Sequence, residues 1–291
     1  MAEVIARIAS QTFLPWEPLL IMPIGDIQYD GPDGAADLPR LARLIEWGMA
    51  RNVWFLGMGD FVDFLSPSNR DRLQKAGLYD TAQQVVDRAA GQLEDEIGEI
   101  LAPTTGRWIG LLQGHHYFVH LDGTTSDTRR ANLLKAPFLG DCVIIRVTFK
   151  EGVNRGATTI KIWAHHGHGG AGVLPTAGLN RLYHQKVRYP NVRLFLMGHV
   201  PQLGHVVTDG LDVTSKGSPQ IIHEDTHYVM TGGYARAYQQ GSHLAGRPQG
   251  GYAEKRMLPP AVLGSPVIQL TPEHIHRNKT TYRTVDVKVT S

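Results

Sequence analysis

The chain has almost no cysteine: Cys142 is the one thiol among 291 residues. A single cysteine excludes an intrachain disulfide and is typical of a protein from a reducing compartment. Because Cys142 begins the apolar run 142–145, we expect a buried thiol rather than a nucleophile.

Long hydrophobic runs and a leader sequence are also missing. The apolar stretch 19–22 has only the length of a strand and is bounded by Pro18 and Pro23, whereas a membrane-spanning helix needs about 20 apolar residues. The first seven residues lack the basic segment and apolar core of a secretory signal. The sequence therefore predicts a cytoplasmic protein without a membrane partner, and it leaves the oligomeric state open.

An excess of charge of either sign is absent too, since 29 Lys and Arg stand against 27 Asp and Glu. With no dense basic stripe, the charge pattern neither requires nor excludes a nucleic-acid partner. Histidine, in contrast, is abundant, with 14 residues. Imidazole titrates near neutral pH and binds metal ions, so this content favours a metal or phosphate site.

Apolar segments alternate with helical patterns in the first two thirds of the chain. Strands are predicted at 19–24, 53–57, 107–112, 142–149, 159–164 and 192–197. Helices are predicted from Asp37, as N-cap, to Ala50 and over 80–101. Strands separated by helices predict parallel β-α units.

Shorter alternating segments follow and predict antiparallel pairing at 221–222, 228–230, 267–270 and 282–289. We therefore expect an α/β (α+β) sandwich with mixed sheets. A single domain is expected over residues 1–291, with an N-terminal extension at 1–16 and a C-terminal loop and strands at 232–291. Polar stretches predict long loops at 64–72, 119–130, 167–179 and 232–259.

Two aspartates each follow a predicted strand. Asp26 comes after the strand 19–24 and Asp60 after the strand 53–57. Because these strands flank one helix, a right-handed crossover brings their ends together. Two close carboxylates repel each other unless a cation neutralises them, so both are predicted metal ligands, with turn and helix-cap roles as the alternatives. Asp63 is predicted to orient another group or to cap the loop.

Histidines end three further strands. They are His115 and His116, then His165 and His166, and finally His199. Adjacent side chains in an extended strand point in opposite directions, so one member of each pair can bind a metal while the other faces elsewhere. Spacing alone leaves His165 and His166 as alternatives. Imidazole and carboxylate ligands together suit a divalent metal ion.

The order of these motifs resembles that of the calcineurin-like metallophosphoesterases. Their pattern runs D-x-H, G-D-x-x-D, G-N-H-D/E, a strand-end histidine and G-H-x-H. The resemblance spans residues 20–205, and the loop 59–70 is similar to phage and bacterial members. It implies a four-layer αββα sandwich with two divalent metals. It also implies hydrolysis of a phosphodiester or a phosphomonoester by metal-activated water.

Three of the five motifs depart from that pattern. Gln28 replaces the histidine of D-x-H, His115 the asparagine of G-N-H, and Pro201 the second histidine of G-H-x-H. The resemblance therefore implies a weakened first metal site, with Asp26, Gln28 and Asp60 as its remaining ligands. It implies an intact second site made of Asp60, His115, His165 or His166, and His199. His205 either restores the missing ligand or is an ordinary strand histidine.

The resemblance also implies roles and cofactors. His116 matches the histidine of G-N-H, which resembles a general acid or a phosphate-stabilising group. The expected cofactors are one or two divalent metal ions, with manganese first and iron, zinc, nickel and magnesium as alternatives. The expected partner is a phosphate-ester substrate, such as a nucleotide or nucleic acid, with substrate-binding residues unassigned. The alternative is a weakened or inactive member that binds or scaffolds another molecule.

Other polar clusters receive structural interpretations. The segment 223–227 is predicted to be a polar hairpin turn, and His274 and His276 are predicted to face solvent. Arg70 is predicted to be a solvated loop residue, with anion binding as the alternative.

Overall fold

A computed structural model describes residues 14–32, 34–152, 156–169, 176–213, 219, 221–238, 241, 243–244, 246–249, 252–255, 257, 259–277 and 280–291. Most of the predicted N-terminal extension, residues 1–13, lies outside the described residues, as do parts of the predicted loops 167–179 and 232–259.

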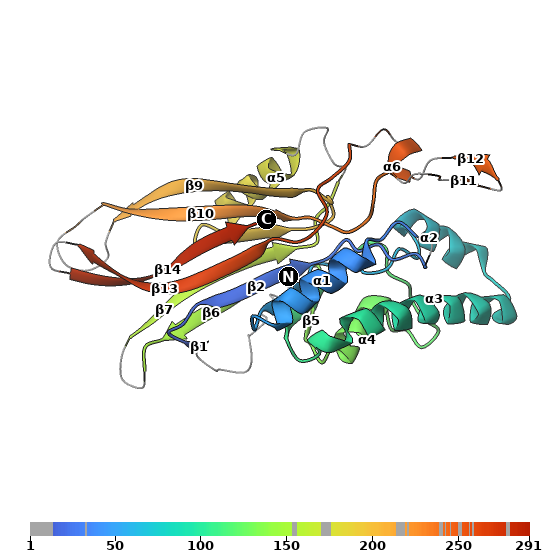
Figure 1. Cartoon of the computed structure of the whole chain (residues 1–291), viewed down its shortest axis with the longest axis horizontal. Helices are drawn as coiled ribbons and strands as arrows, with labels where there is room; N and C mark the ends of the chain where they lie inside the picture. Colours follow the sequence, from blue (N-terminus) through green and yellow to red (C-terminus); the bar gives the residue numbers. More distant parts are fainter. Residues whose placement is uncertain are drawn as a thin grey trace.

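Two six-stranded mixed sheets form the centre of the fold (Figure 1). The first sheet has the order β14 (Thr280–Thr290), β13 (Val267–Arg277), β2 (Leu19–Ile24), β3 (Trp54–Gly57), β4 (Trp108–Leu112) and β5 (Phe138–Gly140). Strands β2 to β5 are parallel, whereas β13 pairs antiparallel with both β2 and β14.

The second sheet has the order β1 (Leu14–Pro15), β6 (Cys142–Lys150), β7 (Ala157–His165), β8 (Leu194–Met197), β10 (Ile221–Thr231) and β9 (Leu203–Val213). Strands β7, β8 and β10 are parallel, and the pairs β6–β7 and β9–β10 are antiparallel. A separate ribbon pairs β11 (His243–Leu244) with β12 (Arg247–Pro248), ahead of the short α6 (Tyr252–Lys255).

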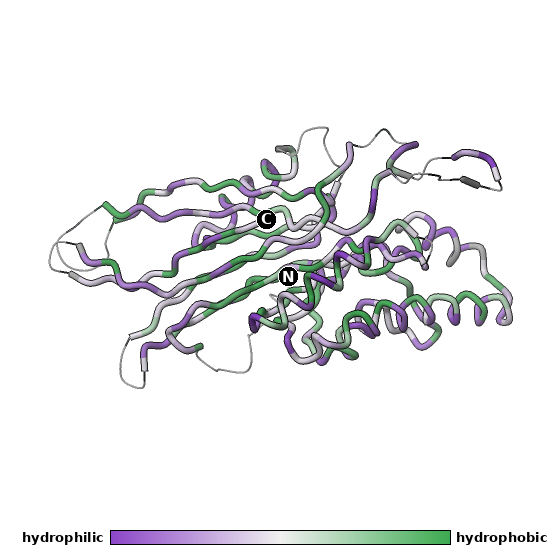
Figure 2. The backbone as a smooth tube through the Cα atoms, viewed as in Figure 1, coloured by the Kyte–Doolittle hydropathy of each residue, from purple (hydrophilic) through white to green (hydrophobic). Residues whose placement is uncertain are grey.

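Alternate residues of the central strands enter different core layers. In β8, Leu194 and Leu196 belong to the core between the sheets, whereas Phe195 and Met197 face the layer that contains Leu182 of α5 (Thr176–Arg188). The strands are therefore buried on both faces, which explains their continuous apolar sequences. Figure 2 shows hydrophobic residues along these central strands.

Helices cover the outer face of each sheet. Buried residues of α1 (Leu38–Met49), α3 (Asp80–Leu101) and α4 (Ser126–Leu133) pack with the outward residues of β2, β3 and β4. Helix α5 packs against β8 and β10 of the second sheet. The resulting order of layers is helix, sheet, sheet, helix, so the predicted α/β fold with a four-layer αββα arrangement is confirmed.

Local sequence explains where α1 begins. The Asp37 carboxylate accepts a hydrogen bond from the amide of Arg40, and a proline stands in the first turn. The predicted N-cap is therefore confirmed. The bounds of α3 also agree with the prediction. Its buried side includes a charged residue, Glu94, whereas the apolar side chain of Val85 is 66% exposed. The burial of Glu94 is compensated by a polar contact, since Glu94 accepts a hydrogen bond from buried His120.

Several predicted loops contain regular structure. Helix α2 (Pro67–Ala76) includes most of the residues predicted as the loop 64–72, and α4 begins within the predicted loop 119–130. Their short, polar sequences carry little apolar periodicity, but Ser66 and Thr125 cap their first turns. The predicted turn 223–227 is also wrong, because this segment lies inside β10 and pairs with β9.

His276 is exposed, as predicted, whereas His274 is partly buried. His274 stacks on Trp16 and contacts Glu151, and His276 is hydrogen-bonded to Thr281. Among the described residues, no helix has both the length and the apolar character to cross a membrane.

Candidate metal centre

The carboxyl ends of five strands from both sheets carry the predicted ligands to one place. In the first sheet, β2, β3 and β4 are followed by Asp26, Asp60 and His115. In the second sheet, β7 and β8 are followed by His166 and His199. The side chains fall into two groups, in which the ligand atoms lie within 4.8 Å of one another: Asp26, Asp60 and His166, and then His115, His166 and His199.

The backbone at this place adopts a conformation that non-glycine residues rarely use. The φ angles are 48° at Asp26, 51° at Gln28, 53° at Asp60 and 65° at His199. Such left-handed conformations cost about 1–3 kcal/mol each and concentrate at functional sites. Their clustering at the strand ends indicates a site whose geometry the surrounding fold imposes.

Three buried polar atoms in the first group have no hydrogen-bond partner: Asp26 Oδ1, Asp60 Oδ2 and His166 Nε2. The residues themselves are at most 2% exposed. Asp60 Oδ2 and His166 Nε2 lie 3.2 Å apart as an ion pair, whereas Asp26 Oδ1 is left without a partner, at a cost of about 1–3 kcal/mol for an unpaired buried polar atom. One ligand atom from each of the three residues lies within 4.8 Å of the others. Two carboxylate oxygens and one imidazole nitrogen are ligands that divalent transition metals accept, so the residues present fit a metal ion.

A backbone carbonyl sets the tautomer of His166. Its Nδ1 lies 2.6 Å from the carbonyl oxygen of Met58. Because a carbonyl only accepts, Nδ1 carries the proton, and Nε2 faces Asp60 Oδ2 at 3.2 Å. Metal-binding histidines commonly donate their second ring nitrogen to such a carbonyl. Burial lowers the pKa of His166, but contact with Asp60 and the charge of Asp26 raise it to about 9.

The two oxygens of Asp60 have different surroundings. Oδ1 accepts hydrogen bonds from the amides of His115 and His116, at 2.5 and 2.9 Å, whereas Oδ2 is the unpaired atom that faces His166. Burial raises the pKa of Asp60, but the contact with His166 and the charge of His116 hold it well below its ordinary value. Asp60 is therefore an ionised carboxylate with one oxygen directed at the candidate metal position.

Asp26 is joined to the second sheet through its other oxygen. Its Oδ2 accepts a hydrogen bond from the amide of His199 at 2.8 Å. Burial raises the pKa of Asp26 to about 7, and the negative charge of Asp60 contributes to this increase while His166 opposes it. The raised pKa reflects the cost of two buried carboxylates in one place.

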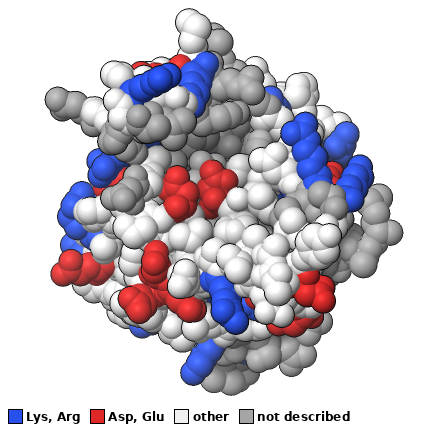
Figure 3. Space-filling model, turned by 90° about the vertical axis from the view of Figure 1, so that its right-hand side faces the viewer, with Lys and Arg blue, Asp and Glu red and all other residues white. Residues whose placement is uncertain are grey.

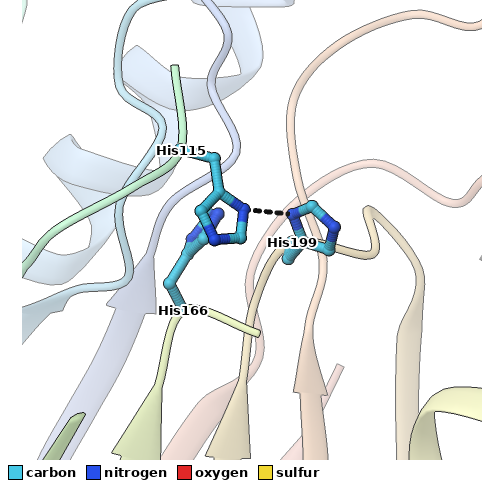
Figure 4. A group of neighbouring side chains, drawn as sticks. All are labelled: His115, His166 and His199. Atoms are coloured by element: carbon cyan, nitrogen blue, oxygen red, sulfur yellow. Dashed lines mark hydrogen bonds between the residues drawn. The ribbon is translucent and has the colours of Figure 1, made fainter. Parts of the chain in front are cut away.

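His115 and His199 lie beside each other, with their Nδ1 atoms 3.1 Å apart (Figure 4). Burial, together with the neighbouring His166 and His115, lowers the pKa of His199 to about 4. Burial and His166 also lower the pKa of His115. Both rings are therefore neutral near pH 7, which is the form that binds metal ions.

A histidine–carboxylate pair borders the two groups. His116 Nδ1 lies 2.5 Å from Asp63 Oδ1, and both side chains are partly exposed. Burial lowers the pKa of His116, but the hydrogen bond to Asp63 and the charge of Asp60 outweigh this effect and raise it. His116 is thus oriented by a residue from the segment after β3, so Asp63 has a structural partner where the sequence left its role open.

The structure does not bring every predicted ligand to the two groups. His165 points elsewhere: its Nδ1 accepts the amide of Gly167 at 2.7 Å and its ring stacks on Trp163. Gln28 is joined to the site through its backbone, because its amide donates to the carbonyl oxygen of Asp60 at 3.0 Å. His205 lies on β9 and contacts His227 rather than this site.

Two residues near the site have contacts that the sequence did not predict. Asp127, which is 3% exposed, accepts a hydrogen bond from the amide of Gly114 at 2.7 Å. Arg70 donates to the carbonyl oxygens of His115 and Tyr117 and lies over the Tyr117 ring, so it holds this loop instead of standing free for an anion. The sequence signal for Asp127 was an acidic residue in the first turn of a helix. Many helices without a functional role have such a residue there.

Figure 3 shows the end of the molecule that lies on the right in Figure 1. Acidic side chains gather near the middle of this face, and Lys and Arg stand in separate groups around them. A nucleic-acid surface is expected to carry a continuous patch of basic residues. In the part of this face that the structure describes, the basic residues form no such patch.

Comparisons with known proteins add little to this geometry. No protein-family model matches the chain, and no curated protein matches it. A solved structure of Vacuolar Protein Sorting 29 from Cryptosporidium parvum is similar at 14% sequence identity, with 94% of this chain and 98% of that chain covered and a TM-score of 0.34. A similarity at this TM-score carries no argument about function.

Proposed function

We propose that this protein is a metal-dependent phosphoesterase. One observation carries the proposal: the buried ligand groups of Asp26, Asp60 and His166 lie within 4.8 Å of one another, and Asp26 Oδ1 has no hydrogen-bond partner. Divalent cations at two neighbouring positions, one held by Asp60 and His166 and the other by Asp60 and Asp26, would satisfy these groups, and their donor types suit manganese, iron or zinc. The order of motifs along the chain supports the same activity, since it resembles the calcineurin-like metallophosphoesterases.

The ligand set favours one metal position over the other. Asp60, His115, His166 and His199 supply a carboxylate and three imidazoles, and the two imidazoles with lowered pKa are ready to bind. At the other position, Asp26 and Asp60 supply oxygen ligands, but Gln28 and Pro201 stand where the resemblance expects histidines. We therefore propose one firmly bound metal and a second that binds more weakly.

The chain's own residues have distinct tasks in this reaction. Asp60, His115, His166 and His199 would hold a divalent metal ion, which when bound would supply Lewis-acid polarisation of the phosphoryl group and an activated water. His116 stands beside the ligands with a raised pKa, so it is suited to donate a proton to the leaving oxygen or to stabilise the phosphoryl charge. Asp63 holds the His116 ring through Nδ1, which leaves Nε2 as the atom that faces substrate.

The charge pattern of the face shown in Figure 3 favours a small phosphate ester over nucleic acid as substrate. Acidic side chains stand in the middle of the face shown in Figure 3, and the basic residues around them are not continuous. A polymer of phosphates binds through many Lys and Arg contacts, whereas a single phosphoryl group needs only the metal and a few polar partners. We therefore propose a mononucleotide or another small mono- or diester as substrate.

The test is hydrolysis of bis-p-nitrophenyl phosphate, p-nitrophenyl phosphate, a nucleotide panel and single-stranded DNA by the full chain with added Mn²⁺. We expect hydrolysis of small esters that chelation with EDTA abolishes. Loss of a residue that merely supports a ligand costs about 10–100-fold in metal affinity, so Asp60→Asn should weaken Mn²⁺ binding by at least about 100-fold. Exposed Asp71, replaced by Asn, provides the matched control.

Absence of hydrolysis of every substrate, although the protein binds Mn²⁺, would exclude the enzyme. That outcome favours the second candidate function, a metal-holding binding or scaffolding protein. The direct contact between His115 and His199, at 3.1 Å, supports this second candidate because two ligand nitrogens satisfy each other without a metal. Binding of no metal at all by the purified protein would remove the phosphoesterase proposal entirely.

A further inference from the structure

We propose that Asp127 is a positioning residue of the candidate metal centre, which acts by fixing the turn 114–116. This inference rests on the proposed function, because it concerns the same metal. Asp127 lies in α4 and not at a strand end, so it has no counterpart among the residues predicted from the sequence.

Three successive amides of this turn donate to carboxylates from two directions. Gly114 donates to Asp127 Oδ2 at 2.7 Å. His115 and His116 then donate to Asp60 Oδ1 at 2.5 and 2.9 Å. Asp127 therefore holds the first peptide of the segment whose next two residues are a predicted ligand and the predicted proton donor.

The turn packs closely against Asp60, and this close approach requires glycine at position 114. A Cβ atom built on Gly114 would lie 2.1 Å from Asp60 Oδ1 and 2.2 Å from the Asp60 amide nitrogen. The backbone of the turn is thus in direct contact with the carboxylate. Because Oδ1 and Oδ2 belong to one rigid group, any shift of the turn redirects Oδ2, the oxygen that faces His166.

Asp127 itself is held by rigid secondary structure. It lies in the first turn of α4, which a capping box of Thr125 and Thr128 fixes. Arg130, at 2% exposure, stands one turn further and donates to the carbonyl oxygen of Glu94 in α3 at 2.7 Å. The carboxylate position is therefore set by the packing of two helices, which is what a precise outer support of a metal ligand requires.

The same loop is anchored independently at its far end. The buried His120 ring lies between Asp87 and Glu94 of α3, at 3.0 and 2.6 Å. This anchor keeps the loop folded without reaching the metal ligands. Loss of Asp127 should therefore disturb the turn 114–116 more than the fold of the loop.

Two variants at one position separate the hydrogen bond from the fold. Asp127→Asn keeps a side-chain oxygen that can accept the Gly114 amide, whereas Asp127→Leu has a similar volume and no acceptor. We measure the Mn²⁺ dissociation constant by calorimetry, the visible absorption spectrum of the Co²⁺ form, and thermal unfolding in EDTA. Asp127→Leu should bind Mn²⁺ about 10–100-fold more weakly and alter the Co²⁺ spectrum, while Asp127→Asn stays close to wild type in both.

Equal Mn²⁺ affinity and an unchanged Co²⁺ spectrum in Asp127→Leu would overturn the role of Asp127. An equal loss in Asp127→Asn and Asp127→Leu would overturn it as well, since the acceptor would then be irrelevant. If Asp127→Leu does not fold in EDTA, Asp127→Ala takes its place in the same comparison. Failure of the wild-type protein to bind Mn²⁺ identifies failure of the proposed function itself.

Discussion

At the scale of single residues, three candidate ligands, Asp26, Asp60 and His166, are oriented by backbone groups. The Met58 carbonyl accepts from His166 Nδ1, the amides of His115 and His116 donate to Asp60, and the amide of His199 donates to Asp26. A backbone partner is positioned by the fold and not by side-chain rotamers. The ligands are therefore preorganised before a metal binds.

Glycine permits one of these close approaches. Gly59 has a φ of 90°, and a Cβ atom there would lie 2.7 Å from the Gly114 Cα and 2.8 Å from His166 Nδ1. The segment after β3 therefore passes directly between the turn 114–116 and the His166 ring.

The first residue-scale prediction concerns His116 and Asp63. His116→Ala should lower kcat about 10²–10⁴-fold, as expected for loss of a positioned proton donor, and leave Mn²⁺ affinity unchanged. Asp63→Asn should lower kcat by a smaller factor, because the ring keeps its place but loses the carboxylate that orients it. Steady-state kinetics with an aryl phosphate measures both effects.

The matched control for this prediction is His184→Ala, which removes an exposed imidazole on α5. It should keep the wild-type kcat. A His116→Ala variant with wild-type kcat would show that His116 takes no part in catalysis.

At the scale of secondary structure, the edge hairpin of β9 and β10 contains a second histidine pair outside the candidate centre. His205 Nε2 and His227 Nδ1 lie 3.1 Å apart with stacked rings. His227 is 5% exposed, and burial together with His205 lowers its pKa to about 4. Asp225, Arg193 and Asp286 supply the remaining nearby charges.

This pair predicts a loss of stability in acid. The pKa of His227 in the folded state lies below the ordinary value of 6.5, so the unfolded chain binds the proton first as the pH falls. Its contribution to the free energy of unfolding is therefore present above pH 6.5 and decreases toward pH 4. Between pH 7.5 and pH 5 the loss should be about 2 kcal/mol.

Chemical denaturation at the two pH values measures this loss, with His227→Asn as the variant that does not titrate. The variant should lose less stability than wild type over the same interval. His184→Asn, at an exposed position, should behave as wild type. An equal decrease in wild type and His227→Asn would contradict the prediction.

At the scale of the whole molecule, the candidate centre connects the two sheets. Asp26, Asp60 and His115 follow strands of the first sheet, whereas His166 and His199 follow strands of the second. A bound metal therefore joins the sheets at one edge of the core that they share. Ligands that bind only the folded state stabilise it, so metal binding should raise the unfolding temperature.

Thermal unfolding with and without Mn²⁺ tests this prediction. At a metal concentration of about 100 times the dissociation constant, the gain is about 2.7 kcal/mol, which corresponds to an increase of about 5 °C in the unfolding temperature. Asp60→Asn should abolish the increase, whereas Asp71→Asn should retain it. An unchanged unfolding temperature in wild type would mean that the metal does not join the sheets.

The sequence by itself determined the central strands, the two longest helices of the first layer, and the residues that stand at the strand ends. These features follow from local patterns, since a strand buried on both faces is a continuous apolar run, as in Leu194 to Met197, and a helix start needs a cap such as Asp37. Local patterns did not predict the short polar helices α2 and α4 or the continuous strand β10, because neighbouring elements stabilise them.

Only the tertiary structure decided which side chains meet. It turned His166 toward Asp60 and His165 onto Trp163. The Met58 carbonyl, which accepts a hydrogen bond from His166, comes from the segment after a strand of the other sheet. It also placed Asp127 behind Gly114 and Asp63 beside His116. These contacts join segments that are distant along the chain or separated by loops, and their geometry depends on how sheets and helices pack, which no local spacing encodes.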